Sequence, residues 1–366
     1  MINQQRLINT FLELIQIDSE SGNEATIRTV LIKKLSKLGL EFTTDKTGNL
    51  HGNLPGKIKG KALLFSAHMD TVKPGCGVKP VIKADKITSR GNTILGADDK
   101  SGIAVILEML EIIKENKILT VPIKVLFTVS EEVGLKGSST LKKNSINADY
   151  GFIMDTNGPI GTIITSAPSN DTFTAIVQGK AAHAGIEPEK GVNAIVAASK
   201  AISKMKLGRI DSETTANISI IEGGKAINIV PQEVTIQGEA RSRNEQKLIK
   251  QITHMKTTFE TECSKMGAKV KFINTREYDA FNITPRHELV KLCQKAAAGI
   301  NIKAIVKSTG GGSDANHLNH LGIPAVVLST GMAKVHTTDE FIKIPDMFKA
   351  AEFILAIAKL QNEFSN

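Results

Sequence analysis

The stretch Leu126–Glu132, with the sequence LFTVSEE, is an apolar run that ends in two adjacent carboxylates. The residues from Val121 to Val129 are β-branched, aromatic and nearly continuous in their apolarity, which is the pattern of a strand covered on both faces in a parallel sheet. Successive side chains on a strand point to opposite faces, so Glu131 and Glu132 should diverge and serve different roles, such as proton acceptor and metal ligand. For this stretch alone, two solvated glutamates in a loop are the simpler interpretation.

Length and composition limit the class of protein. The chain has 366 residues and is 41% hydrophobic, so it is long enough for two cores. No run approaches the roughly 18 apolar residues of a membrane span, and the first residues predict an amphipathic helix rather than a secretory signal. The 3 cysteines are far apart, which favours neither disulfides nor a thiolate zinc site. We therefore expect a cytoplasmic protein with no membrane partner.

The formal net charge of +9 raises the question of nucleic acid. The lysines, however, are scattered along the chain and interleaved with acids. With no Trp and only 2 Tyr, the chain also lacks aromatic side chains on which bases could stack. The composition therefore predicts a solvated basic surface and no nucleic-acid partner.

Other expected elements carry polar residues at their ends. The apolar run Ala62–Ala67 leads into His68 and Asp70, which face the same way on an extended chain, so the carboxylate could orient the imidazole. Upstream, Ser21 and Glu24 have the spacing of a capping box at the start of a helix. These patterns predict one site-bearing strand and one scaffold helix.

A helix start and a short strand add further carboxylates. The stretch GADDKSG at 96–102 opens a helix, where we expect one of Asp98 and Asp99 to be the N-cap and the other to be available. The apolar segment Tyr150–Met154 predicts a strand that leads directly into Asp155.

Six acidic or imidazole side chains share one kind of position, because each follows an expected buried strand or begins the helix after one. They are His68, Asp98, Glu131, Glu132, Asp155 and His336. In an open α/β sheet such strand ends gather at one crevice. So many carboxylates together require a cation to neutralise them. Two imidazoles and no thiolate favour zinc, with cobalt or manganese as substitutes, over magnesium or calcium.

The pattern changes at about residue 169 to alternating strands with two helical segments, and long helices with buried strands resume near residue 283. We therefore expect an α/β fold, with a mostly parallel-sheet catalytic domain formed by residues 1–168 and 283–366. An α+β domain, residues 169–282, would be inserted into it.

Four short motifs occur in register along most of the chain. They are HMDTV at 68–72, GADDK at 96–100, SEEVG at 130–134 and GGSD at 311–314. Together they resemble the co-catalytic zinc aminopeptidase and deacylase family, and most strongly its peptidase T (tripeptidase) and peptidase T-like branch, although each motif alone is weak. The resemblance implies a zinc-exopeptidase fold in which the inserted domain is a lid that also mediates dimerisation.

The resemblance also implies the metal ligands, which spacing alone leaves open. Asp98 would bridge two Zn²⁺ ions in each subunit. His68 and Asp155 would complete one metal site, and Glu132 and His336 would complete the other.

The resemblance further implies two catalytic roles. Asp70 would hold His68. Two metals about 3.5–4 Å apart would activate a shared water as hydroxide, and Glu131 would be the general base that takes the proton of this water.

Lid residues would complete the site, again by resemblance. His183, in the stretch GKAAHAG, would stabilise the oxyanion, often from the partner subunit. Asn228 and Arg241 would contact the substrate, although a surface salt bridge is the alternative for Arg241. Gly311 and Gly312 would cradle the substrate backbone, since the glycine run lacks the ending of a phosphate-binding loop.

The predicted function is hydrolysis of the amino-terminal peptide bond of short peptides, with a homodimer as the assembly. Tripeptidases of this type carry Arg where this chain has Gly310, so strict tripeptide specificity stays open. The alternative is a two-zinc amidohydrolase or deacylase of N-acyl amino acids or related small amides. A metal-free scaffold protein is a further alternative, but it predicts a lost ligand, and none is lost here.

Overall fold

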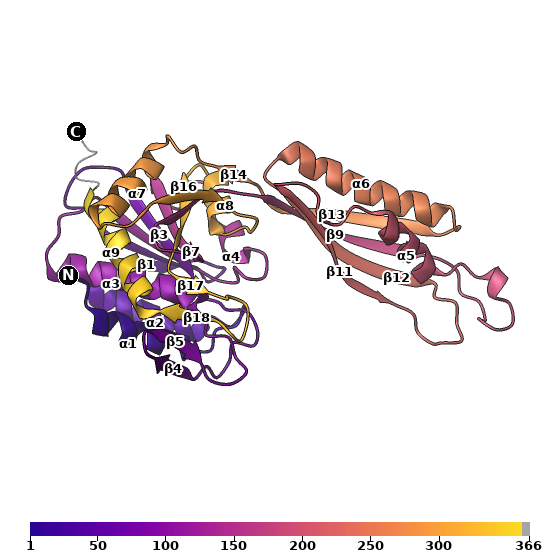
Figure 1. The fold of residues 1–366 in the computed structure, drawn as a ribbon, viewed down its shortest axis with the longest axis horizontal. Helices are drawn as coiled ribbons and strands as arrows, with labels where there is room; N and C mark the ends of the chain where they lie inside the picture. Colours follow the sequence, from indigo (N-terminus) through magenta and orange to yellow (C-terminus); the bar gives the residue numbers. More distant parts are fainter. Residues whose placement is uncertain (361–366) are drawn as a thin grey trace. The chain divides into compact units, whose positions relative to one another are not determined.

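The structure is a computed structural model that describes residues 1–360. Contacts divide the chain into two compact units, each with a hydrophobic core of its own. Among the described residues, the first contains Met1–Ser166, Asn282–Thr309 and residues 313–360. The second contains Ala167–Phe281 together with Gly310–Gly312. Figure 1 shows the elements of each unit.

The first unit is built on a large sheet with the strand order β1-β2-β6-β3-β7-β16-β8-β14, with β15 paired to β8. The central pairs β6–β3, β3–β7 and β7–β16 are parallel, whereas β2 and β8 run antiparallel to β6 and β16. This mostly parallel centre confirms the predicted fold class. The strands are β1 (Glu41–Thr44), β2 (Leu50–Leu54), β3 (Leu63–His68), β6 (Ile123–Thr128), β7 (Tyr150–Thr156), β8 (Thr162–Ala167), β14 (Phe281–Asn282), β15 (Ile305–Ser308) and β16 (Ala325–Ser329).

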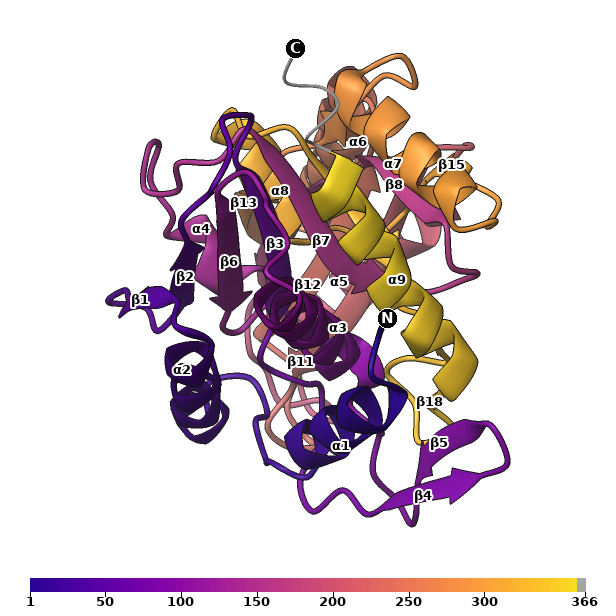
Figure 2. The ribbon, with the colours of Figure 1, turned by 90° about the vertical axis from the view of Figure 1, so that its left-hand side faces the viewer.

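Helices cover this sheet on both sides. Helix α3 packs against β3 and β7, and α1 and α9 pack against α3 (Figure 2). Helices α8 and α4 lie together on the other side of the sheet, where α8 contacts β7 and β16 (Figure 1). The helices of this unit are α1 (Gln4–Ile15), α2 (Ala25–Leu38), α3 (Ala97–Glu115), α4 (Lys136–Ser139), α7 (Glu288–Gly299), α8 (Asp314–His320) and α9 (Ile344–Leu360).

The start of α3 lies unusually close to β7, and Gly102 permits this approach. A Cβ at Gly102 would lie 2.4 Å from Asp99 Oδ1 and 2.7 Å from the Cβ of Met154. Only glycine lets two backbones approach so closely. The first turn of α3 is thereby held over the carboxyl ends of β3 and β7.

A small sheet, β17-β18-β5-β4, completes the first unit. Its strands β17 and β18 flank the segment that carries His336 and Glu340, so this sheet supports that segment at both ends. The strands are β4 (Pro80–Lys83), β5 (Lys86–Ser89), β17 (Met332–Ala333) and β18 (Phe341–Lys343).

Two predicted helix caps are wrong. Helix α2 follows Glu24 with no side-chain capping bond. Instead, Ser21 Oγ donates to Asp70 Oδ2 at 2.7 Å, while Glu24 Oε1 accepts the N–H groups of Gly22 and Ser130 at 2.8 and 2.9 Å. Neither side chain therefore caps α2, and each has a partner in a distant segment.

The second error concerns α3. Its N-cap is Gly96, with a φ of +76°, and no side chain caps the helix. Asp98 and Asp99 have non-helical backbone angles, and Asp99 Oδ2 accepts the N–H of His68 at 3.2 Å. Both carboxylates are thus turned toward β3 and away from the capping position.

The second unit is an α+β structure. Its sheet has the order β10-β11-β12-β9-β13, and every pair is antiparallel. Inward-facing apolar residues of these strands form a core with α5 and α6. The elements are β9 (Ser169–Gln178), η1 (Pro188–Lys190), α5 (Ala194–Lys204), β10 (Gly208–Arg209), β11 (Thr214–Gly223), β12 (Glu233–Ser242), α6 (Glu245–Ser264) and β13 (Lys269–Tyr278).

Among the described residues, no helix combines the length and the apolarity that crossing a membrane requires.

Candidate metal centre

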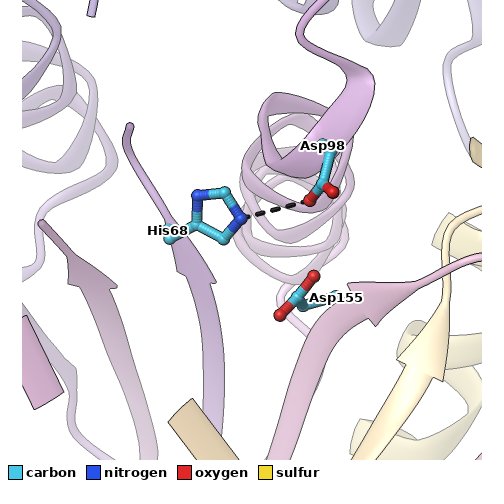
Figure 3. A group of neighbouring side chains, drawn as sticks. All are labelled: His68, Asp98 and Asp155. Carbon is cyan, nitrogen blue, oxygen red and sulfur yellow. Dashed lines mark hydrogen bonds and ion pairs between the residues drawn. The ribbon is translucent and has the colours of Figure 1, made fainter. Parts of the chain in front are cut away.

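Three predicted ligands converge at the carboxyl edge of the large sheet. His68 ends β3, Asp98 lies in the first turn of α3, and Asp155 lies near the end of β7 (Figure 3). One ligand atom from each residue lies within 4.8 Å of the other two. His68 Nε2 and Asp98 Oδ1 are 3.1 Å apart. We call these three residues the His68 group.

A second set of ligands shares Asp98 with the first. The ligand atoms of Asp98, Glu132 and His336 also lie within 4.8 Å of one another. His336 Nε2 is 3.3 Å from Asp98 Oδ2 and 3.0 Å from Glu132 Oε1. We call these residues the His336 group. Because each oxygen of Asp98 faces a different imidazole, this carboxylate has the geometry of a bridge between two cations.

The charges within these groups shift their pKa values strongly. Burial alone would lower the pKa of His68, but its contacts with Asp70 and Asp98 raise it well above the ordinary value. Contacts with Asp98 and Glu132 raise the pKa of His336 to about 10. Burial would raise the pKa of Asp98, but the two imidazoles hold it far below its usual range. In the absence of a cation, the neighbouring carboxylates thus favour the protonated form of both imidazoles.

For Glu131 and Asp155, the charge of His68 does not outweigh burial. Burial raises the pKa of Glu131 well above normal, and the charge of Asp155 adds to the shift. Burial and the charge of Asp98 do the same for the pKa of Asp155. Among the described residues, the buried atoms Asp99 Oδ1 and Asp314 Oδ1 accept no hydrogen bond. A carboxylate-rich site with two imidazoles and unbonded acceptor atoms fits divalent cations that prefer mixed nitrogen and oxygen ligands.

Asp70 connects His68 with the tip of β6. Its backbone oxygen lies 2.9 Å from His68 Nδ1, and its Oδ1 lies 3.5 Å from the same nitrogen. Its carboxylate also accepts the N–H groups of Glu131 and Glu132, at 2.9 and 3.2 Å. Asp70 therefore fixes an imidazole of the His68 group and the backbone of the two glutamates at once. Glu131 itself is buried and belongs to neither group.

Comparison with known proteins identifies the family. The family model described as "Peptidase family M20/M25/M40" matches residues 64–360, which is most of the chain. The chain belongs to this peptidase family. This confirms the family that the four sequence motifs predicted.

Several known proteins are similar to this chain along nearly its whole length. The uncharacterised protein YqjE of Bacillus subtilis is 45% identical over 365 residues, with 98% of each chain covered. The crystal structure of a tripeptidase from Staphylococcus aureus is 42% identical, with a TM-score of 0.95 over 99% of this chain and 100% of that one. The crystal structure of aminopeptidase PepT from Bacillus cereus is 44% identical, with a TM-score of 0.90 over 99% of both chains.

The predicted lid residues of this peptidase lie in the second unit. His183 is exposed on a loop, where Ala184 N–H donates to the backbone oxygen of Asn228 at 2.9 Å. His183 and Asn228 are therefore neighbours within that unit. Arg241 on β12 donates two hydrogen bonds to the carboxylate of Glu239, each of 2.9 Å. That ion pair is the alternative expected for Arg241.

The glycines of the GGSD region differ from one another. A Cβ at Gly312 would lie 2.3 Å from the ring of Tyr278, so a side chain there would displace the tyrosine. A Cβ at Gly310 would meet nothing within 4 Å, and Gly310 does not have a positive φ. Gly311, the other predicted contact residue here, is partly buried.

The sequence analysis missed three buried charged residues near the metal ligands. Asp314 Oδ2 accepts a 2.5 Å hydrogen bond from Thr128 Oγ1, and its place in the GGSD motif could have indicated it. Lys100, in the GADDK motif, donates to the backbone oxygen of Ile17 at 2.7 Å. Burial raises the pKa of Glu340 to about 7, and no motif marks this residue.

Proposed function

We propose that this chain is a cytoplasmic, dimeric, two-metal exopeptidase that removes the amino-terminal residue of short peptides, as a tripeptidase does. The observation that carries the proposal is the pair of ligand groups that share Asp98 at the carboxyl edge of the sheet. The tripeptidase and aminopeptidase names of two structures that match along the whole chain support the substrate class. Zn²⁺ suits the ligand set best, and Co²⁺ or Mn²⁺ would be substitutes.

His68, Asp98 and Asp155 would hold one cation, and Asp98, Glu132 and His336 the other. When bound, the two cations would polarise the scissile carbonyl and make water a stronger nucleophile near neutral pH. The imidazoles must release their protons to become ligands, so cation binding would be coupled to proton release.

Glu131 would carry out the proton transfer. Its carboxylate would accept a proton as water attacks the scissile carbonyl carbon, and it would return this proton to the leaving amine nitrogen as the C–N bond breaks. Burial raises the pKa of Glu131 well above normal. A raised pKa makes Glu131 a stronger base than a solvated glutamate, which suits a group that accepts a proton and returns it.

Asp70 would be the positioning residue for this step. Its contacts with His68 Nδ1 and with the N–H groups of Glu131 and Glu132 hold an imidazole and the two glutamates in register. Such supporting contacts fix the orientation of a metal ligand and its tautomer.

The second unit would bind the substrate. His183 would donate a hydrogen bond to the oxyanion, Asn228 and Arg241 would contact the peptide, and Gly311 and Gly312 would accommodate its backbone. The exposure of His183 in this chain is consistent with a role that begins only when substrate, or a partner subunit, is present.

The second unit would also form the homodimer. Strand β11 pairs with the two-residue strand β10 only at Thr215 and Ala216, so its outer edge beyond them has no strand partner among the described residues. Ile220 and Ile221, on this part of the strand, are 44% and 49% exposed. An open edge with exposed isoleucines is a surface that a second copy could cover.

The test is hydrolysis of defined substrates by the metal-loaded protein. Tripeptides should be cleaved to a free amino-terminal residue and a dipeptide, and dipeptides and N-acyl amino acids should be cleaved more slowly. Preferential release of acyl groups would support the amidohydrolase alternative. Absence of any peptide cleavage by protein that contains two metals would contradict the proposal.

A further inference from the structure

Glu340 is a buried carboxylate that binds the backbone next to the shared ligand Asp98. The residue is 1% exposed. Its Oε2 accepts the N–H groups of Leu95 and Gly96, both at 2.7 Å, and its Oε1 accepts the N–H of Asp98 at 3.0 Å. One side chain therefore holds the segment that delivers Asp98 to both ligand groups.

The carboxylate is bound by backbone N–H groups. The charge of the buried Lys100 also attracts it, but its three hydrogen bonds come from the backbone at the start of α3. This arrangement suits a carboxylate, because hydrogen bonds to an ionised acceptor are strong and a helix start favours negative charge. A neutral side chain could not bind all three N–H groups as well.

Glu340 is also attached to the second imidazole ligand by a short, internally bonded loop. His336 precedes it by four residues. Within this loop, Thr337 Oγ1 donates to the backbone oxygen of Lys334, just before His336, at 2.8 Å. The N–H of Glu340 donates to the backbone oxygen of Thr337 at 3.1 Å. The loop that carries His336 is therefore hydrogen-bonded directly, through Glu340, to the segment that carries Asp98.

We propose that Glu340 is a positioning residue that sets the separation of Asp98 from His336, so that the His336 group can bind its cation. His68 and Asp155 lie on β3 and β7 and are placed by the sheet. The His336 group, in contrast, combines a loop residue with the start of a helix, and Glu340 is the side chain that joins these two segments. The inference rests on the proposed function only in requiring that both groups bind cations.

The substitution Glu340→Gln tests the contact with little change of shape. Three N–H donors are shared between two carboxylate oxygens, but an amide offers one oxygen and one NH₂ group. In either orientation of the amide, the NH₂ group would face the N–H of Asp98 or those of Leu95 and Gly96. Glu340→Asp keeps both oxygens on a shorter side chain and should therefore restore part of the effect.

Glu108→Gln is the matched control. Glu108 is also on α3, is 2% exposed, and accepts hydrogen bonds from Asn3 N–H and from Arg6. The control therefore removes a buried, hydrogen-bonded carboxylate from the same helix, ten residues away from Asp98.

The experiment is titration of the metal-free full-length chain with Co²⁺, followed by calorimetry and by the visible absorption of bound cobalt. The wild type and Glu108→Gln should bind two Co²⁺ per chain. Glu340→Gln should bind the first with little change and the second about 10- to 100-fold more weakly, with an altered cobalt spectrum. Glu340→Asp should lie between them. Thermal unfolding of each metal-free variant shows that it is folded.

Wild-type affinity for the second Co²⁺ in Glu340→Gln would overturn the inference. So would equal losses in Glu340→Gln and Glu108→Gln, because they would indicate a general effect of burial. If Glu340→Gln does not fold, Glu340→Asp decides the matter, and an unchanged second affinity there contradicts the inference. A wild type that binds two Co²⁺ but cleaves no peptide would contradict the proposed function alone. A wild type that binds fewer than two would contradict both.

Discussion

The two ligand groups share Asp98 but are held in different ways. In the His68 group, the imidazole is 1% exposed, ends a central strand and is held by Asp70 from behind. In the His336 group, the imidazole is 51% exposed and lies on a loop residue with a φ of +63°. The first group is therefore part of the core of the sheet, whereas the second is assembled at its surface from a loop and a strand tip.

A two-metal site needs both a fixed geometry and access to its cations, and the two groups would each supply one of these properties. Buried ligands in regular strands provide a fixed geometry, because moving them would disturb the packed core. An exposed ligand on a loop can move at little cost and leaves its cation open to exchange and to substrate. We expect the His68 group to bind the tighter cation and the His336 group to respond more to its surroundings.

The largest expected effect separates proton transfer from metal binding at the tip of β6. Glu131→Gln should lower kcat about 10³-fold or more, because the amide cannot accept the proton, while both metals remain bound. Glu132→Ala should instead reduce the metal content from two per chain to one. Activity assays with metal analysis measure both effects. Equal metal loss in the two variants would refute this division of roles.

The next effect compares the two imidazoles in the metal-free protein. His68→Ala should lower the free energy of unfolding by about 3 kcal/mol or more, because it leaves buried carboxylates without a partner. His336→Ala should lower it by less than His68→Ala does, since that imidazole is half exposed and water screens its contacts with the carboxylates. Urea unfolding in the presence of a chelator at pH 7 measures the difference. Equal losses would contradict the distinction between the groups.

The proton on His336 gives a pH dependence of a defined sign. In the folded metal-free protein its pKa is raised to about 10, above the ordinary value of 6.5. A raised pKa stabilises the folded state fully below the unfolded value, so this contribution should be lost as the pH rises from about 6.5 to about 10. Urea unfolding of metal-free wild type against His336→Ala over this range should show it. A parallel pH dependence of the two proteins would exclude the effect.

The smallest effect on the metal centre is expected from the second unit. Ile221→Glu places a charge on the open edge of β11 and should convert the proposed dimer to a monomer, measured by light scattering. Both metals should stay bound, because all their ligands lie in the first unit. Turnover should fall if His183 acts from a partner subunit.

The control for this prediction is Ile82→Glu, which changes a comparably exposed isoleucine on β4 of the first unit. It should leave the dimer and the turnover unchanged. If the dimer survives Ile221→Glu but is lost in Ile82→Glu, the interface lies on the first unit. That result would contradict the proposal that the second unit forms the dimer.

The sequence predicted the fold class and the convergence of the candidate ligands because strand ends are a topological property. Apolar runs marked β3, β6 and β7, and the carboxyl ends of parallel strands lie at one edge whatever the details of packing. Glu340 could not be found in this way, since it acts on the backbone of residues more than 240 positions earlier in the chain. The caps failed for a related reason, because Ser21, Glu24 and Asp98 have long-range partners that local patterns do not encode.

Two glycines of the run at 310–312 differ in whether the structure leaves space for a side chain. Gly312 is dictated by its neighbour, since the ring of Tyr278 occupies the space of any side chain there. Gly310 is not dictated by sterics, because open space surrounds it. The space at Gly310 would accept a longer side chain, including the arginine that the resemblance to tripeptidases leads us to expect there. We therefore expect a side chain introduced at Gly310 to change the surface of this segment with little cost in stability.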